Sequence, residues 1–277
     1  VIERVGPDTQ LTHVYRARMF YKKEKMGEAL CNPEILLGPP SPPDVKVGRM
    51  NPAGIAFFYG ADDIAVALSE VRPIVGSSVL VARFEILRPM RVLNLDALKL
   101  LIEEGSYFDP NYAVRLGRKH FFPELWFDLL RPTMPGEEEM DYLPTQAIAE
   151  FLAAPDSLNI DGIKHPSVQA GHQGNNIIFF HGHGGVRVVH RPKPLYVEWP
   201  FEIEDQPDVI VRESNFQKDS EQSEEGYDCD LLCNDGQESS LQLDINNIGL
   251  YHISSVKTNY SSQKVIWKAH DFKTQHS

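Results

Sequence analysis

Alternating apolar and polar residues predict strands toward both ends of this chain. Successive side chains of a strand point to opposite faces, so a half-buried strand has an apolar residue at every second position. This pattern, rich in β-branched and aromatic residues, predicts strands at 11–20, 77–87, 92–96, 160–166 and 241–256. Continuous apolar runs at 54–60 and 176–180 predict buried strands, and residues 186–192, 195–203 and 263–269 have extended character.

Helical spacing dominates the middle of the chain. In "ADDIAVALSEVRP", either Asp62 or Asp63 can cap a helix that Pro73 ends. A second helix is predicted from about Pro144 to Ala153, and residues 97–131 also have helical spacing, interrupted near "YFDPNY" and "FFPE". Because strands lie toward both ends and helices lie between them, the order favours an α+β fold over repeating βαβ units.

Three segments predict irregular structure. The proline density of "LGPPSPPDVKVGR" predicts a loop that leads to Arg49. Residues 130–144, "LRPTMPGEEEMDYLP", predict a second loop, whose glutamates form a solvated face. Residues 205–240 are acidic, polar and short of large apolar side chains, which predicts a long loop or a disordered insertion.

Composition and charge exclude several classes of protein. The 277 residues are 42% hydrophobic and 24% charged, which is ordinary for a globular protein of one large or two small domains. No apolar run approaches the roughly 18 residues that span a bilayer, and the first residues are not those of a signal peptide. The formal charge of −12 disfavours nucleic-acid binding. We therefore expect a cytoplasmic protein that binds neither membrane nor nucleic acid by itself.

Cysteine and histidine positions give little support for a metal site. The three cysteines, Cys31, Cys229 and Cys233, cannot all pair, and free thiols in a reducing compartment are the expected state. The last two are four residues apart but lack the second pair of ligands that a zinc site needs. In "HGHGG", His181 and His183 lack a third ligand and are better explained as turn residues.

Nucleotide-binding and hydrolase motifs are absent from the sequence. There is no GxGxxG and no Walker A sequence, so a Rossmann or P-loop nucleotide site has no support. Ser167 lies near His165 and His172, but without the Gly-x-Ser-x-Gly turn of a nucleophile elbow. A serine hydrolase is therefore not expected.

Five residues at the edges of the predicted elements could carry chemistry: Arg16, Arg49, Tyr59, Glu70 and Ser167. Each also has a simple structural explanation. The arginines could form surface ion pairs, the tyrosine could lie in the core, the glutamate could be a solvated helix position and the serine a turn former. Taken singly, none of them identifies a site.

Taken together, these segments resemble a known family. "VYRAR", "GRMNPAGIAFFYGADDIAVALSEVRP", "YLPTQAIAEFL" and "IDGIKHPSVQAGHQGNNIIFF" resemble, in order and character, the RES domain, named for its Arg, Glu and Ser. The resemblance runs from about residue 11 to 180, and "LQLDINNIGLYHISSV" is similar to the strand pair on which such domains often end. It implies one domain over residues 1–277, with an ADP-ribosyltransferase-like mixed β core, flanking helices and a variable acidic insertion at about 205–240.

The resemblance implies a function, since characterised RES domains are bacterial toxins that destroy NAD. It assigns the Arg, Glu and Ser of the name to the catalytic residues Arg49, Glu70 and Ser167. It assigns Arg16, Tyr59 and Asn176 to further positions of the NAD-binding pocket. NAD is then the substrate, inorganic phosphate a candidate co-substrate, and no cofactor or metal is implied. An antitoxin of Xre type that covers the cleft is the implied partner.

The chemistry of NAD cleavage fits these residue types. Breaking the bond between nicotinamide and ribose develops positive charge on the sugar, which the Glu70 carboxylate would stabilise. The guanidinium groups of Arg16 and Arg49 suit a pyrophosphate or phosphate. The ring of Tyr59 can stack on the cationic nicotinamide, and the Ser167 hydroxyl can reach phosphate or ribose.

Two alternatives remain open at the level of sequence. The first is ADP-ribosylation of a macromolecule, which often uses an acidic residue or glutamine two positions before the glutamate. Leu68 stands there and weakens this alternative. The second is a catalytically silent module that binds a nucleotide or a protein, against which the presence of Arg49, Glu70 and Ser167 argues.

Overall fold

A mixed β-sheet forms the centre of the protein. The computed structural model describes residues 1–41, 44–99, a few positions between 108 and 124, and residues 138–154, 158–189, 195–199, 209–213 and 239–256. The described strands of the sheet are β1 Ile2–Val5, β2 His13–Phe20, β3 Phe58–Ala61, β4 Ser78–Ile86, β5 Met90–Asn94, β6 Gly162–Pro166, β7 Asn175–Phe179, β8 Val186–Arg187 and β11 Leu241–His252. A separate pair joins β9 Leu195–Glu198 to β10 Ile210–Glu213.

The strand order brings the two ends of the chain into one sheet. It runs β1-β5-β6-β7-β3-β2-β4-β11-β8, with parallel pairing between β5 and β6 and between β11 and β8. The junction between β2 and β3 is narrow, because their only register pair is Tyr15 with Ala61. On its other edge, β2 pairs with β4 from His13 to Phe20. The backbones of β2 and β3 therefore separate beyond this pair, and the sheet opens there.

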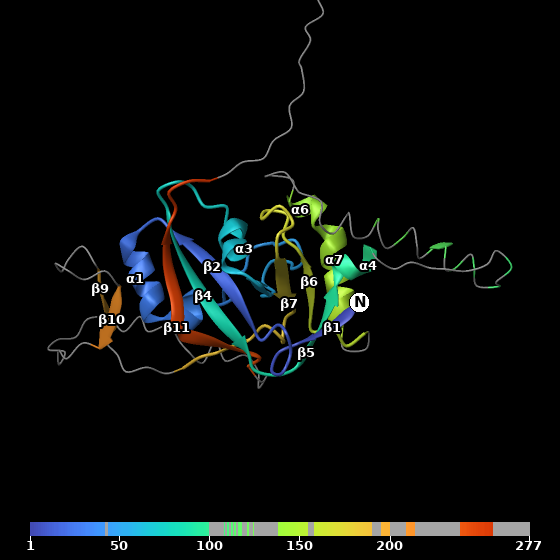
Figure 1. Ribbon diagram of the computed structural model, residues 1–277, viewed down its shortest axis with the longest axis horizontal. Helices are drawn as coiled ribbons and strands as arrows, with labels where there is room; N and C mark the ends of the chain where they lie inside the picture. Colours follow the sequence, from blue (N-terminus) through green and yellow to red (C-terminus); the bar gives the residue numbers. More distant parts are fainter. Residues whose placement is uncertain are drawn as a thin grey trace, which may run out of the picture.

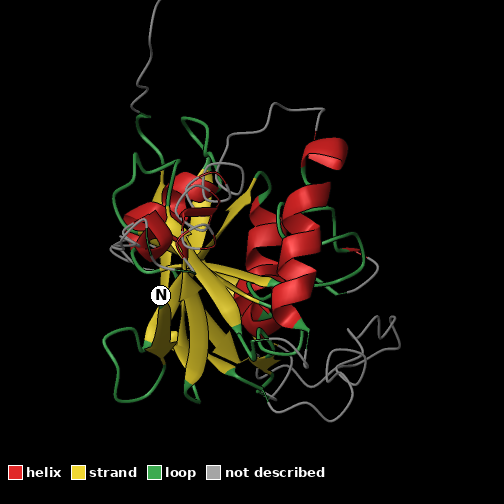
Figure 2. Cartoon of the chain, turned by 90° about the vertical axis from the view of Figure 1, so that its right-hand side faces the viewer, coloured by secondary structure: helices red, strands yellow, loops and turns green. Residues whose placement is uncertain are grey.

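Helices lie to both sides of the strands, as Figure 2 shows. They are α1 Lys23–Cys31, α2 Pro33–Leu36, α3 Ile64–Glu70, α4 Leu95–Lys99, α6 Glu138–Asp141 and α7 Leu143–Ala153. Helix α3 contacts β2, β3, β4 and β7 (Figure 1). It begins after Asp63, whose side chain accepts a hydrogen bond from the Ala65 N–H at 2.7 Å, as an N-cap does.

Apolar burial fixes these helices on the sheet. Val66 and Ala67 of α3 pack with Ala61, Val79 and Val81. On α7, the buried apolar side chains belong to a second cluster, composed of Met50, Phe57, Leu95, Leu98, Ala149, Leu152, Ile160, Ile163, Ile178 and Phe180. Because that cluster includes Met50 and Phe57, α7 also holds the loop before β3.

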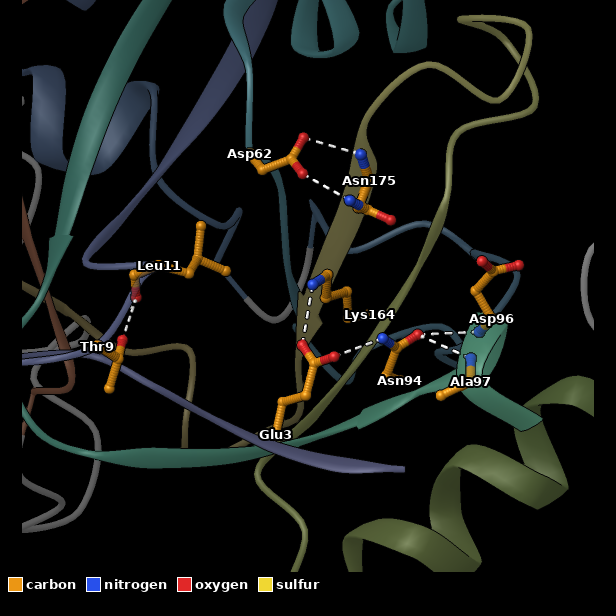
Figure 3. A network of polar contacts seen from close by, with 9 residues as sticks. All are labelled: Glu3, Thr9, Leu11, Asp62, Asn94, Asp96, Ala97, Lys164 and Asn175. Atoms are coloured by element: carbon orange, nitrogen blue, oxygen red, sulfur yellow. Dashed lines mark hydrogen bonds and ion pairs between the residues drawn. The ribbon is translucent and has the colours of Figure 1, made fainter. Parts of the chain in front are cut away.

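Polar contacts link several strands of the sheet and their connections, as Figure 3 shows. Asp62 accepts hydrogen bonds from the backbone N–H of Asn175 at 2.8 Å and from its side-chain amide at 2.7 Å, which ties the start of β7 to the residues just before α3. Glu3 on β1 pairs with Lys164 on β6 at 2.9 Å and accepts from Asn94 at 2.5 Å. The connection between β3 and α3 is thus held firmly against β7.

The predicted α+β class is confirmed, and so are most of the predicted strands and helices. The predicted strand at 54–60 is wrong in its first half, since β3 begins at Phe58. Gly54 has a φ of +83°, and the Asn51 side chain donates to the carbonyls of Lys46 and Pro52, which fold these residues into a turn. Three further elements, β1, α1 and α2, were not predicted.

Other corrections concern the predicted loops. The loop at 130–144 contains α6, and the acidic segment at 205–240 contains β10, whose Arg212 pairs with Glu198 at 2.8 Å. The segment predicted as extended at 186–192 is described as far as residue 189, and within this part the strand β8 covers Val186–Arg187. Most of 97–131, residues 214–238 with Cys229 and Cys233, and the predicted strand at 263–269 lie outside the described residues. In the described part of the chain, no helix has the length and apolar character to cross a bilayer.

Candidate active site

A cavity of about 410 Å³ opens where β2 and β3 separate. This volume lies within the range of small-molecule sites. Five of the six residues assigned by the sequence line it: Arg16, Arg49, Tyr59, Glu70 and Asn176. The sixth, Ser167, lies directly behind Glu70 and contacts it. The other lining residues are Tyr15, Ala17, Gly60, Ala61, Ala67, Val71, Arg72, Tyr142, His165, Val168, Gln169 and Ile178.

Two distant segments orient the Glu70 carboxylate. Glu70 is the last residue of α3, and its Oε1 accepts hydrogen bonds from Ser167 Oγ at 2.6 Å and from Asn176 Nδ2 at 2.8 Å. Within the described residues, Oε2 has no hydrogen-bond partner. Since Glu70 is exposed at the cavity wall, that oxygen is available to a ligand.

Ser167 is fully buried in a turn that its own backbone closes. Its N–H donates to the Gly174 carbonyl at 3.0 Å, and its Oγ accepts from the Ala170 N–H at 3.1 Å. At Gly174, φ is +78° and an added Cβ would lie 2.5 Å from Val66 Cγ2, so this turn packs closely against α3. The predicted contact between the Ser167 hydroxyl and phosphate or ribose does not match this geometry, because the hydroxyl proton is donated to Glu70.

Arg16 spans the opening between β2 and β3. Its Nη1 donates to the Tyr59 carbonyl at 2.8 Å, and its Cζ lies 5.4 Å from the centre of the Phe58 ring. Burial, together with the nearby charge of Arg18, lowers the pKa of Arg16 to about 10, against a smaller opposing effect of Tyr59. The guanidinium is therefore still protonated at neutral pH, and it gives the cavity a fixed positive charge.

The loop before β3 brings Arg49 to the cavity. Its Cζ lies 5.8 Å from the centre of the Tyr142 ring, within cation–π range, and its carbonyl accepts from the Thr145 hydroxyl of α7. Gln146 of α7 donates to the Gly48 carbonyl at 2.8 Å. The N-terminal turn of α7 therefore holds the backbone on both sides of the Arg49 Cα.

Tyr59 presents its ring to the cavity while its hydroxyl is held by the same loop. The hydroxyl donates to Asn51 Oδ1 at 2.6 Å and accepts from the Met50 N–H at 3.3 Å. Burial raises the pKa of Tyr59, so the phenol is neutral at physiological pH. The structure thus fixes the position of the ring at the wall of the cavity.

Sequence reasoning did not assign several residues that line the cavity. Tyr142 begins the segment "YLPTQAIAEFL" that carries part of the family resemblance, but no role was assigned to it. Arg72, next to Gln169, has a φ of +46°, and its Nη2 lies 2.9 Å from the Gln169 amide oxygen when that amide is turned toward it. The sequence places His165 near Ser167 but gives it no role in NAD cleavage. It is the register partner of Asn176 in the pairing of β6 with β7, which no local sequence pattern shows.

The arrangement suits an anionic ligand with one centre that gains positive charge. Arg16, Arg49 and Arg72 supply positive charge around the cavity, and Glu70 supplies one carboxylate with a free oxygen. Among the residues that the structure describes, no three His, Cys, Asp or Glu side chains gather as ligands for a metal ion.

The comparison with protein families agrees with the resemblance found in the sequence. The family model for the RES domain matches residues 29–203, more than half of the chain, and this range contains every assigned site residue except Arg16. No curated protein and no solved structure matches the chain. This protein belongs to the RES domain family, an NAD-related and toxin-like domain.

Proposed function

We propose that this protein cleaves the bond between nicotinamide and ribose in NAD, by phosphorolysis or hydrolysis. The observation that carries the proposal is the Glu70 carboxylate at the cavity wall. One of its oxygens is fixed by Ser167 and Asn176, and the other faces the site. A carboxylate held in this way needs no reorganisation when charge develops beside it.

Glu70 would act on the sugar. As the bond to nicotinamide lengthens, the ribose gains oxocarbenium character, which a fixed carboxylate stabilises more strongly in the transition state than in the ground state. Nicotinamide leaves as a neutral molecule with the bonding electron pair, so the reaction has little need of a strong acid. Ser167 then acts as a positioning residue for Glu70.

The arginines would bind the phosphates. Arg16 and Arg49 lie on β2 and on the loop before β3, and both line the cavity. A guanidinium binds a pyrophosphate or an incoming phosphate through a planar fork of donors. Tyr59 offers a ring that can stack on the cationic nicotinamide. Phosphate as acceptor would yield ADP-ribose-1″-phosphate, and water would yield ADP-ribose.

Leu68 favours cleavage over transfer to a macromolecule. Its side chain packs against the cluster of Ala61, Val66 and Val79, on the core side of α3, and is not among the residues that line the cavity. The position two residues before Glu70 therefore offers no polar group to bind an acceptor side chain.

Uncontrolled loss of NAD would harm the cell that makes the enzyme, so we further propose that an antitoxin covers the cleft.

The test is nicotinamide release from NAD by the purified protein, with and without inorganic phosphate. We expect release that Glu70→Ala lowers at least about 100-fold, because the transition state loses its carboxylate. Glu24→Ala on the exposed face of α1 is the matched control and should keep wild-type activity. Dependence on phosphate would identify a phosphorylase, and release without phosphate a glycohydrolase. Absence of release in both conditions would contradict the proposal.

A further inference from the structure

One buried histidine in the cavity wall has no role in the proposal so far. His165 is 8% exposed and lines the cavity. It lies on β6 opposite Asn176 of β7, and such register partners project their side chains from the same face of a sheet. Asn176 in turn donates to Glu70. His165 therefore stands next to the group that holds the Glu70 carboxylate.

The hydrogen bond of one ring nitrogen determines the state of the other. His165 Nδ1 lies 3.0 Å from the carbonyl oxygen of Pro166, which can only accept, so Nδ1 carries a hydrogen. Burial lowers the pKa of His165, against upward effects of the Pro166 contact and Glu70, while Arg49 lowers it further. The ring is thus neutral at physiological pH, and Nε2 bears a lone pair.

Nε2 has no hydrogen-bond partner among the described residues. Among the described residues, the one side-chain nitrogen or oxygen that is both buried and without a partner is Arg83 Nε, so the unpartnered Nε2 of His165 is an accessible atom. Since the side chain lines the cavity and its Nδ1 edge is turned to the backbone, the Nε2 edge is the polar edge that a ligand can use. An acceptor in this position requires a ligand with an O–H or N–H group.

We propose that His165 is a catalytic residue whose Nε2 accepts the proton of the nucleophile that attacks the ribose. The inference rests on the proposed function. The nucleophile oxygen bonds to the anomeric carbon, the bond to nicotinamide breaks with its electron pair on nicotinamide, and the O–H proton of water or hydrogen phosphate passes to Nε2. The imidazolium then gives this proton to solvent.

The charged and titratable groups around the cavity act on this step in opposite directions. Glu70, on α3, favours the imidazolium, whereas Arg49, on the loop before β3, disfavours it. Arg16, Tyr59, Arg72 and Tyr142 also line the cavity. The neighbouring carboxylate of Glu70 favours proton uptake by the neutral imidazole, and the charge of Arg49 favours release of that proton.

The experiment compares kcat and the KM for NAD of the wild type, His165→Asn and His165→Gln across pH, both in water and at saturating phosphate. The control is His172→Asn, in the exposed turn after Ser167 and outside the cavity lining. The quantity read is the ratio of wild-type to variant kcat, which cancels the titration of NAD and phosphate. Thermal unfolding and equilibrium binding of NAD check that each variant is folded.

Above the pKa of His165, we expect the ratio of wild-type to variant kcat to be constant at about 100, with the KM for NAD changed less than about threefold. The ratio should fall toward one at lower pH, because the protonated wild-type imidazole can no longer accept a proton. The ratio for His172→Asn should stay near one throughout.

The possible failures can be told apart. If the wild type cleaves NAD but the His165 ratio stays within about threefold of one, or is large but independent of pH in folded variants, the role of His165 is overturned and the proposed function stands. A rise in KM with unchanged kcat would also overturn it, since that result indicates substrate binding alone. If the wild type releases no nicotinamide, the proposed function itself fails, and the assignment of His165 with it.

Discussion

The orientation of Glu70 depends on a serine that is 97 residues away in the sequence. The Ser167 hydroxyl is fully buried and donates to Oε1 at 2.6 Å, so it has no access to a ligand. In Ser167→Ala, Asn176 alone would hold the carboxylate. A hydrogen bond to a charged group contributes about 1.5–3 kcal/mol. We therefore expect kcat for NAD cleavage to fall about 10-fold or more, with the KM for NAD changed less than about threefold.

Ser77→Ala is the matched control for this variant. Ser77 is also a buried serine of a turn, and its hydroxyl donates to the Ile74 carbonyl at 2.7 Å. Both variants should lower the thermal unfolding midpoint by similar small amounts, but only Ser167→Ala should lower kcat. An equal loss of kcat in both variants would show that general loosening, and not the orientation of Glu70, is responsible.

At the level of single residues, the sequence predicted which side chains gather but not how they interact. The resemblance assigned Glu70, Ser167 and Asn176 to one pocket, and both Ser167 and Asn176 donate a hydrogen bond to Glu70. Ser167 orients Glu70 because its side chain is fully buried and the turn at Gly174 packs closely against α3. No local sequence pattern predicts either feature. His165 was missed because its environment is created by the register of β6 and β7.

At the level of elements, Asp161 joins three segments near the start of β6. It accepts a hydrogen bond from the Arg91 N–H of β5 at 2.6 Å, and its Oδ1 lies 2.9 Å from His183 Nδ1 and 3.9 Å from Arg88. Burial pushes the pKa of Asp161 up, but the contact with His183, the hydrogen bond from the Arg91 N–H and the charge of Arg88 outweigh it, and the net pKa is lowered from its ordinary 3.8. Ionised Asp161 therefore stabilises the fold.

The sign of this contribution predicts how stability depends on pH. A carboxyl group with a lowered pKa stabilises the fold above its ordinary pKa, and that contribution is lost as the pH falls through the folded value. Asp161→Asn should lower the free energy of unfolding by about 1–3 kcal/mol at neutral pH, and the difference should shrink below about pH 4. Denaturant unfolding at several pH values measures it. Asp44→Asn, at an exposed position, should have no effect, and a difference for Asp161→Asn that is independent of pH would contradict the role of its charge.

Elements with a strong local signal were the ones predicted correctly. Helix α3 has both its Asp63 cap and its apolar face in one short segment, and the alternation of β4 is equally local. Helix α1 has a buried face of only Met26, Ala29 and Leu30 among charged residues, and it is stabilised by packing near β9. Strand β1 owes its extended form to pairing with β5, about ninety residues later. Such elements depend on packing or pairing with distant segments, which the periodicity of the sequence does not identify.

At the level of the whole molecule, the opening between β2 and β3 creates the site. The lining comes from β2, β3, α3, β6 and β7 and from the loops at Arg49 and Tyr142, which meet only because the sheet brings them together. Arg16 bridges the opening through its bond to the Tyr59 carbonyl. The α+β class could be predicted from the order of elements, but the place of the opening depends on the single register pair of β2 and β3.

The charge of the whole molecule and the charge of the cavity act on NAD in opposite directions. The chain has a formal charge of −12, whereas the cavity is lined by Arg16, Arg49 and Arg72 against the single carboxylate of Glu70. Salt screens distant charges first, since the Debye length falls from about 30 Å at 0.01 M to about 10 Å at 0.1 M. If the net charge controlled binding, added salt would lower the KM for NAD by weakening the repulsion. We expect the opposite, because the arginines lie closest to the phosphates. The KM should rise several-fold between about 0.01 M and 0.3 M salt.

Two controls test whether the arginines cause this salt dependence. Inhibition by nicotinamide, which is uncharged, should not change with salt, and Arg49→Gln should make the KM for NAD depend less on salt. A KM that falls as salt is added would mean that the surface charge, and not the arginines of the cavity, governs the encounter with NAD.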